Sequence, residues 1–210
     1  MTSPTALSRI IDRYLSSFEV MFGNLFNHDH ESTILAKFLN LEQQKRSLIY
    51  DRKCHPGHIT GSALLLNPSM TKIVLTHHKK LGKWLQLGGH CDGENNPAAA
   101  AQREALEESG LTIADAFCPL KLECVPLSSA APIDFDIHDI PETKTEPAHF
   151  HFDVRYIFTT TENKLEKSSE SNDLGWFTLE EVLNLTNEEA TTRQIHKVMH
   201  LRSKIAPRGF

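Results

Sequence analysis

The chain has 210 residues, of which 40% are hydrophobic and 23% are charged, and its formal net charge is −5. This composition is typical of one sizeable globular domain and argues against a disordered chain. A broad nucleic-acid surface needs an excess of basic residues, so the negative charge predicts no nucleic-acid partner.

The four cysteines are widely spaced and include no Cys-x-x-Cys pair, which argues against a zinc knuckle or a dense disulfide framework. No apolar run approaches the roughly 18 residues that cross a bilayer. Asp12 and Glu19 interrupt the apolar positions near the N-terminus, unlike a secretory signal. We therefore expect a cytoplasmic protein with no membrane partner.

Apolar side chains recur every three or four residues over 4–25, which predicts an amphipathic helix, and a second helix is predicted over 32–44. We interpret residues 1–45 as a helical extension that covers either the main domain, 46–210, or a partner subunit. A homodimer is therefore possible without being required.

Beyond residue 46 the pattern alternates between strands and helices, which predicts an α/β (α+β) sandwich with a mixed sheet. Helix ends are indicated by Gly110 and by the capping-box spacing of Thr178 and Glu181. The predicted elements are strands at Ile59–Leu66, Lys72–His77, Leu120–Pro126 and His149–Thr159, helices at Pro97–Ser109 and from 186–187 onward, a polar loop between the last two strands, and an exposed loop over Thr161–Asn172.

The predicted helix over 97–109 carries three acidic side chains, Glu104, Glu107 and Glu108, at positions that share one face. Their mutual repulsion needs compensation, and a hard divalent cation fits because magnesium takes oxygen ligands beside substrate phosphates. The preceding Gly88-Gly89 turn leaves the backbone free to approach a ligand. Taken alone, three glutamates are more often a solvated helix face.

The whole stretch, Gly88-Gly89 followed by Arg103-Glu104-x-x-Glu107-Glu108-x-Gly110-Leu111, resembles the signature box of the Nudix hydrolases. This box covers 88–111, and the flanking strands extend the resemblance to about 46–210. At the position after Gly89 where the family has a glutamate, this chain has Asn95. Glu94 and Asp92 lie nearby, and either is able to replace its supporting role.

The resemblance implies a Nudix-type α/β/α sandwich and attack by water at phosphorus in a nucleoside diphosphate linked to another group, with Mg²⁺ or Mn²⁺. It implies Glu107, Glu108 and the later-loop residue Glu170 as candidate catalytic groups, although Glu170 is equally a solvated loop residue. The implied metal ligands are Glu104, Glu107, Glu108 and the Gly88 carbonyl, and the implied supporting residues of the box are Arg103, Glu94, Asp92, Gly89 and Gly110.

A second polar group lies on the predicted strand over 149–159, where His149, His151, Asp153 and Arg155 project to one face. Such a face is costly to bury, so we expect it to line a wet cleft in which Arg155 binds phosphate and His149 or His151 contacts substrate. Two alternatives stay open. One is a structural network in which Asp153 pairs with Arg155 or a histidine, and the other is a zinc site that also includes His138.

Two candidate substrate contacts precede the box. Lys79 belongs to a basic run that supplies positive charge, and Trp84 either stacks on a base or covers the core. The principal rival is a Nudix-fold nucleotide-binding or regulatory protein with weak or no catalysis, which Asn95 favours. An isomerase on the same fold lacks an evident acid to partner Cys91, and the absence of a P-loop motif excludes that class of nucleotidase. The sequence does not identify the small nucleotide-like substrate.

Overall fold

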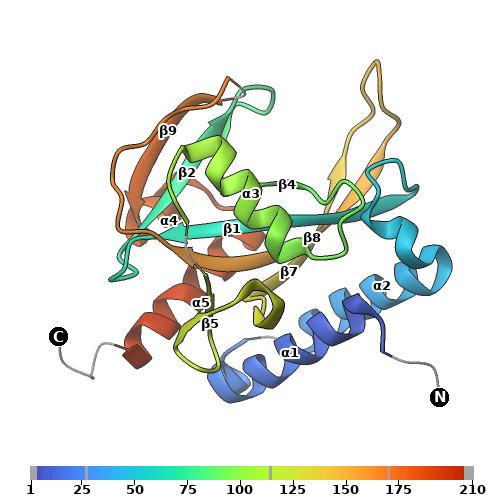
Figure 1. Cartoon of the computed structure of the whole chain (residues 1–210), viewed down its shortest axis with the longest axis horizontal. Coiled ribbons are helices and arrows are strands. Elements are labelled where there is room, and N and C mark those ends of the chain that lie inside the picture. Colours follow the sequence, from blue (N-terminus) through green and yellow to red (C-terminus); the bar gives the residue numbers. More distant parts are fainter. Residues whose placement is uncertain (1–3, 27, 114, 170, 206–210) are drawn as a thin grey trace.

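The protein is built around one mixed sheet with helices packed on both faces, as the computed structural model in Figure 1 shows. The structure describes residues 4–26, 28–113, 115–169 and 171–205. The strands are β1 (Gly57–Leu66), β2 (Lys72–His78), β3 (Lys83–Leu85), β4 (Leu87–His90), β5 (Ala116–Cys118), β6 (Glu123–Val125), β7 (Asp134–Ile140), β8 (His149–Thr159) and β9 (Ser171–Thr178). The helices are α1 (Ala6–Met21), α2 (His28–Lys45), α3 (Pro97–Ser109), α4 (Leu179–Leu185) and α5 (Glu189–Ile205), with short 3₁₀ turns at Gly23–Leu25, Arg46–Tyr50 and Leu127–Ser129.

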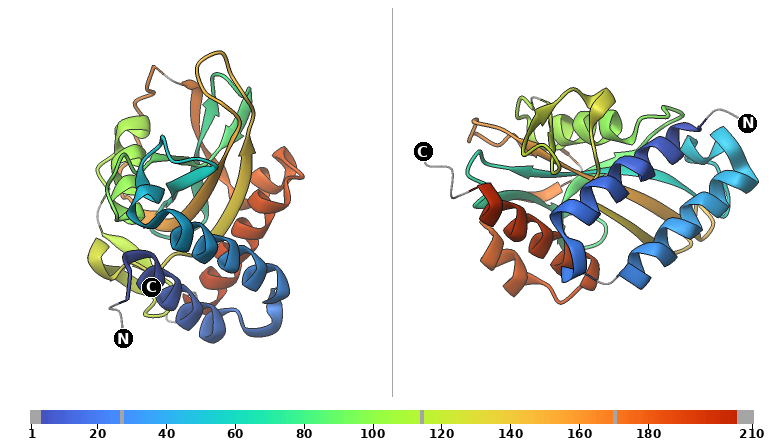
Figure 2. Two further views of the ribbon diagram at one scale, coloured as in Figure 1. Left: turned by 90° about the vertical axis from the view of Figure 1, so that its right-hand side faces the viewer. Right: turned by 90° about the horizontal axis from the view of Figure 1, so that it is seen from below.

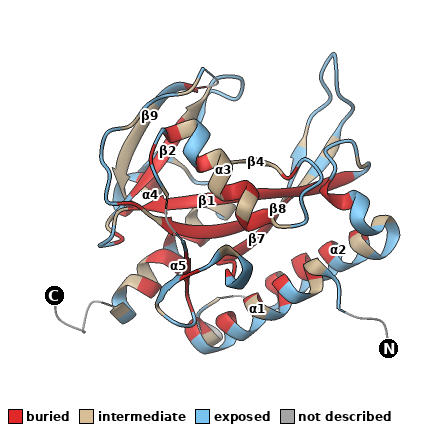
Figure 3. Ribbon diagram, in the orientation of Figure 1, coloured by how far each residue is buried: buried red, intermediate tan, exposed pale blue. Residues whose placement is uncertain are grey.

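Strands β1 and β8 form the centre of the sheet. They run parallel and in continuous register from the pair Gly57 and Phe150 to the pair Leu66 and Thr159. Near the start of β1 the sheet order is β4-β1-β8-β7. Near the end of β1 the order is β2-β1-β8-β5, because β2 replaces β4 beside β1 and β5 replaces β7 beside β8. The two central strands are the most deeply buried part of the chain, as Figure 3 shows.

The N-terminal helices lie side by side against the sheet (Figure 2). Tyr14 of α1 and Phe38 of α2 both pack edge-on against Phe135 of β7, with ring centroids 5.0 and 4.9 Å apart respectively. Phe38 also meets Phe152 of β8 at 5.1 Å. The apolar stripes of these two helices therefore complete the core over one face of the sheet.

Helix α3 packs unusually close to the same sheet face, because the facing residue of β1 is Gly61. A Cβ atom at that position would lie 2.2 Å from the Pro97 carbonyl oxygen and 3.0 Å from the Ala101 nitrogen. The helix has the predicted bounds, with Pro97 in its first turn and Gly110 in the left-handed conformation at its end (φ 69°). Figure 2 shows α5 on the other side of the sheet, which confirms the predicted α/β/α layering.

The structure corrects three predicted elements. The polar loop expected before residue 149 contains β7, which pairs with β8 from Asp134 to Ile140. The strand expected over 120–126 is present but shorter, as β6 (Glu123–Val125), and it forms a hairpin with the unpredicted β5 because the chain turns at Leu122, where φ is +55°. The exposed loop expected over 161–172 ends earlier, since β9 begins at Ser171.

The ends of two helices follow local side-chain chemistry. The Thr5 hydroxyl accepts a hydrogen bond from the Ser8 amide and begins α1, which is shorter than the predicted 4–25. Thr178 and Glu181 form the predicted capping box of α4, with each side chain bonded to the other's backbone N–H at 3.1 and 2.7 Å. Among the described helices, none is long and apolar enough to cross a membrane.

Candidate active site

The acidic cluster of α3, defined as Glu104, Glu107 and Glu108, lies beside Gly88 and Gly89, which belong to strand β4 and do not form the expected turn; Glu104 and Glu108 contact them. A Cβ atom at Gly89 would lie 2.5 Å from the Glu104 carboxyl carbon, so only glycine leaves room for this carboxylate. The Glu108 carboxylate accepts a hydrogen bond from the Gly88 amide at 3.0 Å. The side chains of α3 and the backbone of β4 thus form one local unit.

The three carboxylates differ in exposure. The Glu104 side chain is 21% exposed and that of Glu107 is 61% exposed. Burial raises the pKa of Glu104, whereas its hydrogen bond and ion pair with Arg103 oppose the shift. A partly buried carboxylate beside an exposed one offers oxygen ligands that still reach solvent.

Arg103 connects the acidic cluster to the end of β4, where the loop toward α3 begins. Its Nη2 atom donates to the His90 carbonyl at 2.7 Å and to Glu104 at 3.0 Å. Its Nε atom lies 4.0 Å from the Glu107 carboxylate. One guanidinium therefore holds two of the three acids and the loop backbone in a fixed relation.

The loop between β4 and α3 is exposed at the position where the box departs from the family pattern. Asp92, Glu94 and Asn95 all have exposed side chains, and Asp92 adopts a positive φ of 50°. The loop is held by its backbone, because the Gly93 amide donates to the Tyr50 carbonyl at 2.8 Å. Within the described residues, neither the Asp92 nor the Glu94 carboxylate forms a hydrogen bond or an ion pair.

The remaining candidates around the box lie at different depths. Lys79 is exposed, and Trp84 is half-buried between His77 and Phe177 at ring distances of 5.2 and 4.7 Å. The candidate base Glu170 lies outside the described residues.

The polar face of β8 is buried at Asp153 and Arg155 instead of lining a wet cleft. Arg155 is 3% exposed, and it donates to Asp153, Asp134 and Asp136 at 2.9, 3.0 and 3.0 Å. Its Nη1 atom also reaches the Ala190 carbonyl of α5 at 3.2 Å. This geometry corresponds to the structural ion-pair alternative, because carboxylates and a carbonyl already engage the guanidinium.

Asp153 also anchors the centre of the sheet. Its carboxylate accepts hydrogen bonds from Thr60 at 3.0 Å and Ser62 at 2.8 Å, both on β1. Buried polar groups are tolerated when they are hydrogen-bonded, and every carboxylate oxygen here has a donor. The network therefore joins β1 to β8 by side chains as well as by backbone bonds.

Sequence reasoning missed the larger part of this charge network. Asp134 is fully buried, and Lys197 of α5 donates to it at 2.6 Å and to Glu31 of α2 at 2.8 Å. Arg193 of α5 also binds Asp134, at 2.9 Å. Burial would raise the pKa of Asp134, but Lys197, Arg193 and Arg155 outweigh it and lower the pKa to about 2. The alternation of Asp134, Asp136 and His138 is the signal that would have predicted the strand.

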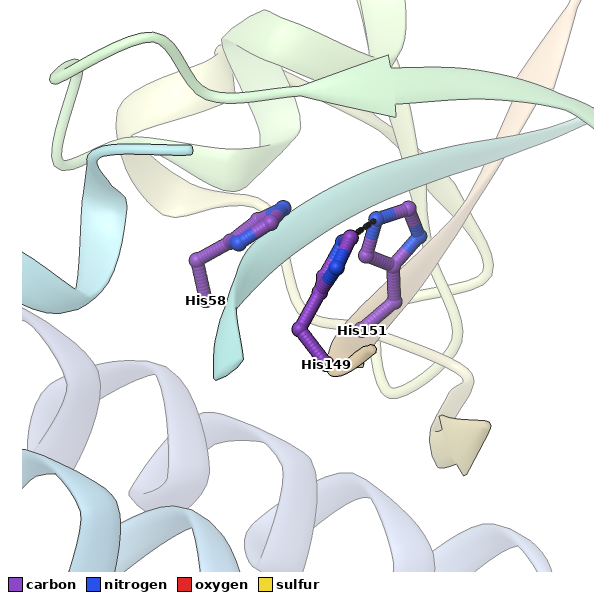
Figure 4. A group of neighbouring side chains, drawn as sticks. All are labelled: His58, His149 and His151. Carbon is purple, nitrogen blue, oxygen red and sulfur yellow. Dashed lines mark hydrogen bonds between the residues drawn. The ribbon is translucent and has the colours of Figure 1, made fainter. Parts of the chain in front are cut away.

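Histidines gather at the other end of this polar face, at the start of β1 and β8. His58 stacks on His149 at 5.1 Å and meets His151 at 4.8 Å, as Figure 4 shows. Burial lowers the pKa of His58 to about 4, and the nearby positive charge of His90 and His149, when protonated, adds to this shift. Burial, followed by His138, lowers that of His151 to about 2. His58 and His90 were not predicted, because they reach the others only through strand pairing.

Comparison with known proteins identifies the family. Residues 57–199, more than half of the chain, match the model of the NUDIX domain. A hydrolase of the NUDIX family from Clostridium perfringens is 29% identical, with a TM-score of 0.50, covering 69% of this chain and 97% of that one.

Two further solved structures are similar at lower identity. A C. elegans Ap4A hydrolase in a binary complex is 14% identical, with a TM-score of 0.49, and the match covers 71% of this chain and 98% of that one. The E. coli dihydroneopterin triphosphate pyrophosphohydrolase is 12% identical, with a TM-score of 0.47, over 66% of this chain and 92% of that one. The comparison with curated protein sequences gave no match. The chain belongs to the Nudix family and is a hydrolase that acts on pyrophosphate bonds.

Proposed function

We propose that this Nudix hydrolase cleaves the phosphoanhydride bond of a nucleoside diphosphate linked to a second small group, with Mg²⁺ or Mn²⁺ at the acidic cluster. The observation that supports this proposal most is the approach of Glu104 and Glu108 to Gly88 and Gly89 of β4, with Glu107 exposed on the same helix. Arg103 compensates part of the negative charge of Glu104 and Glu107, and a divalent cation would compensate the rest.

The residues present fit a hard divalent cation. Glu104, Glu107 and Glu108 supply carboxylate oxygens, and the Gly88 carbonyl is a further candidate ligand, which matches the oxygen preference of Mg²⁺ and Mn²⁺. Such a cation neutralises phosphate oxygens and makes an attacking water more acidic.

The protein's own residues carry out positioning and proton transfer. Arg103 fixes the Glu104 and Glu107 carboxylates relative to the His90 carbonyl, so their geometry is set before substrate arrives. We assign proton acceptance from the attacking water to Glu107 or Glu108, with Glu170 the candidate from outside the box.

Substrate contacts are proposed at the hairpin of β2 and β3, which precedes the box, with Lys79 in its turn and Trp84 on β3. Lys79 is exposed and able to reach a phosphate, and Trp84 offers an aromatic edge beside Phe177. We do not assign phosphate binding to Arg155, because Asp134, Asp136 and Asp153 already occupy its guanidinium.

The test is a screen of the full chain against nucleoside triphosphates, nucleotide sugars, ADP-ribose, dinucleoside polyphosphates and coenzymes, each with Mg²⁺ or Mn²⁺, with release of nucleoside monophosphate or phosphate as the readout. On the best substrate, Glu108→Gln is expected to lower kcat by about 100-fold or more, roughly 2.7 kcal/mol in barrier height. The matched control is Glu180→Gln, an exposed glutamate on α4, which is expected to keep full turnover. Equal turnover by Glu108→Gln and the wild type would overturn the assignment.

A further inference from the structure

Three histidines, His58, His149 and His151, converge where β1 and β8 begin, and we call them the histidine cluster (Figure 4). Each offers a ring nitrogen, and these atoms all lie within 4.8 Å of one another. His58 and His151 are direct neighbours in the β1–β8 ladder, so the strand register itself brings them together.

The histidine cluster is separate from the acidic cluster of α3. Side chains alternate along a strand, so His58 points to the face opposite Gly61, against which α3 packs. Thr60 and Ser62 share the face of His58, and both bind Asp153, which lies on the face of His151. The two clusters therefore lie on opposite faces of the same sheet.

His58 is the least accessible of the three. It is 1% exposed, and neither of its ring nitrogens forms a hydrogen bond of ordinary geometry with a residue that the structure describes, although the backbone of Cys54 lies beside the ring. Leaving a buried polar group unpaired costs free energy, so such groups in folded proteins usually have a partner, an ordered water or an ion. The stacked ring of His149 and the adjacent ring of His151 place further nitrogens beside it.

The hydrogen bonds of His149 fix which of its nitrogens is free to bind. Its Nδ1 atom lies 2.8 Å from the Pro147 carbonyl oxygen, which only accepts, so Nδ1 carries the proton. The Nε2 atom of the neutral ring then presents a lone pair, and a carbonyl that accepts from the other ring nitrogen is the usual support of a metal-binding histidine.

The spacing of one pair of ring nitrogens suits a tetrahedral ion. Nε2 of His149 lies 3.4 Å from Nε2 of His151. Two imidazole nitrogens bound at about 2.05 Å to a tetrahedral zinc ion are separated by about 3.4 Å. The same distance also fits a weak hydrogen bond between the two rings. Titration with Co²⁺ distinguishes a metal site from such a hydrogen bond.

We propose that His58, His149 and His151 bind one divalent transition-metal ion of the zinc class, with a fourth coordination position open to water or another small ligand. Imidazole nitrogens select zinc and its neighbours, whereas carboxylate oxygens select magnesium and manganese. The ligand set differs from the one that the sequence suggested. The expected ligands His138 and Asp153 are engaged elsewhere, because His138 lies 3.6 Å from the Asp136 carboxylate and Asp153 is bound by Arg155. His58 is the third ligand instead.

The test uses the untagged full chain, stripped of metal with a chelator and titrated with Co²⁺, which reports tetrahedral coordination through strong visible absorption, and with Zn²⁺ in competition. We expect one equivalent of Co²⁺ to give tetrahedral bands that Zn²⁺ abolishes. A Glu104→Gln/Glu107→Gln/Glu108→Gln variant is expected to keep these bands. This result does not depend on hydrolysis, so it stands or fails independently of the proposed function.

His149→Ala and His151→Ala are each expected to weaken Co²⁺ binding by more than about 100-fold. Removing a residue that only supports a metal ligand typically lowers metal affinity by about 10- to 100-fold, so a larger loss indicates a ligand. The matched control is His196→Ala, an exposed histidine on α5, which is expected to bind as the wild type does. X-ray absorption of the zinc-loaded wild type, expected to show three imidazole nitrogens, gives a second measurement that needs no variant. The absence of tetrahedral bands in the wild type, or their retention in a folded His149→Ala/His151→Ala chain, would overturn the proposal.

Discussion

Asp134 and Lys197 form an ion pair that is wholly buried, with the carboxylate Oδ1 atom 2.6 Å from Nζ and neither side chain exposed. The pair joins strand β7 to helix α5, and Glu31 of α2 binds the same ammonium group at 2.8 Å. Buried ions are costly to desolvate, so the arrangement is stable only because each charge meets several partners.

Replacing Lys197 with methionine is therefore expected to destabilise the fold. The change keeps much of the side-chain volume but leaves Asp134 and Glu31 without their shared cation, and breaking a buried ion pair on one side costs about 3–5 kcal/mol. Urea unfolding followed by circular dichroism measures the change in the free energy of unfolding. Lys204→Met, at an exposed position of the same helix, is the control and is expected to change it by less than about 0.5 kcal/mol. A loss below about 1 kcal/mol in Lys197→Met would contradict a shared role for the ammonium group.

The same carboxylate predicts how stability depends on acid. Burial favours the neutral form of Asp134, but Lys197, Arg193 and Arg155 outweigh it, and its pKa in the folded state falls to about 2. Because the unfolded pKa is higher, near about 3.9, the folded state binds the proton less tightly. The stabilisation is thus fully present above about pH 4 and is lost as the pH falls toward about 2.

Comparison with Asp134→Asn isolates this contribution. The difference in the free energy of unfolding between wild type and variant is expected to be constant from about pH 7 to about pH 5 and to shrink between about pH 4 and about pH 2. Asp139→Asn, an exposed position on the same strand, serves as the control with a difference that stays flat. If the difference in the free energy of unfolding between wild type and Asp134→Asn did not change below pH 4, the neighbouring cations would not be what keeps this carboxylate ionised.

Gly89→Ala is expected to impair catalysis more than folding. The added Cβ atom would lie 2.5 Å from the Glu104 carboxyl carbon, at the end of a flexible side chain, so the carboxylate moves away instead of the backbone. We expect kcat to fall by about 10-fold or more, since small displacements of catalytic groups are costly. The control is Gly82→Ala, where φ is +63° but nothing lies within 4 Å of the added atom, so it is strained without a steric clash. Steady-state kinetics that are unchanged in Gly89→Ala would place Glu104 outside the reacting geometry.

The elements predicted best are those with local signals. The bounds of α3 follow from Pro97 and Gly110, and β8 follows from the alternation of polar and apolar residues from His149 to Tyr156, continued by the apolar Ile157-Phe158. The acidic cluster was likewise visible, because helical spacing alone places Glu104, Glu107 and Glu108 on one face.

The parts that the sequence left hidden depend on partners far along the chain. Asp134 is tolerated as a fully buried residue because Arg193 and Lys197, on the last helix, neutralise it. His58 joins His151 only through the register of two parallel strands, which periodicity does not determine. Arg155 was expected to line a cleft because only one of its three carboxylate partners, Asp153, is local, whereas Asp134 and Asp136 lie on β7.

The hydroxyl of Tyr14 donates to Glu31 at 2.5 Å and accepts from Lys197 at 2.9 Å. Tyr14 on α1 and Glu31 on α2 both precede the segment that matches the family model. A chain trimmed to that segment would keep the Lys197 ammonium but lose the acid on α2, and it would uncover the aromatic surface around Phe135. The first two helices and the catalytic fold are thus expected to melt in one cooperative transition, as parts of a single folding unit and not as a removable appendix.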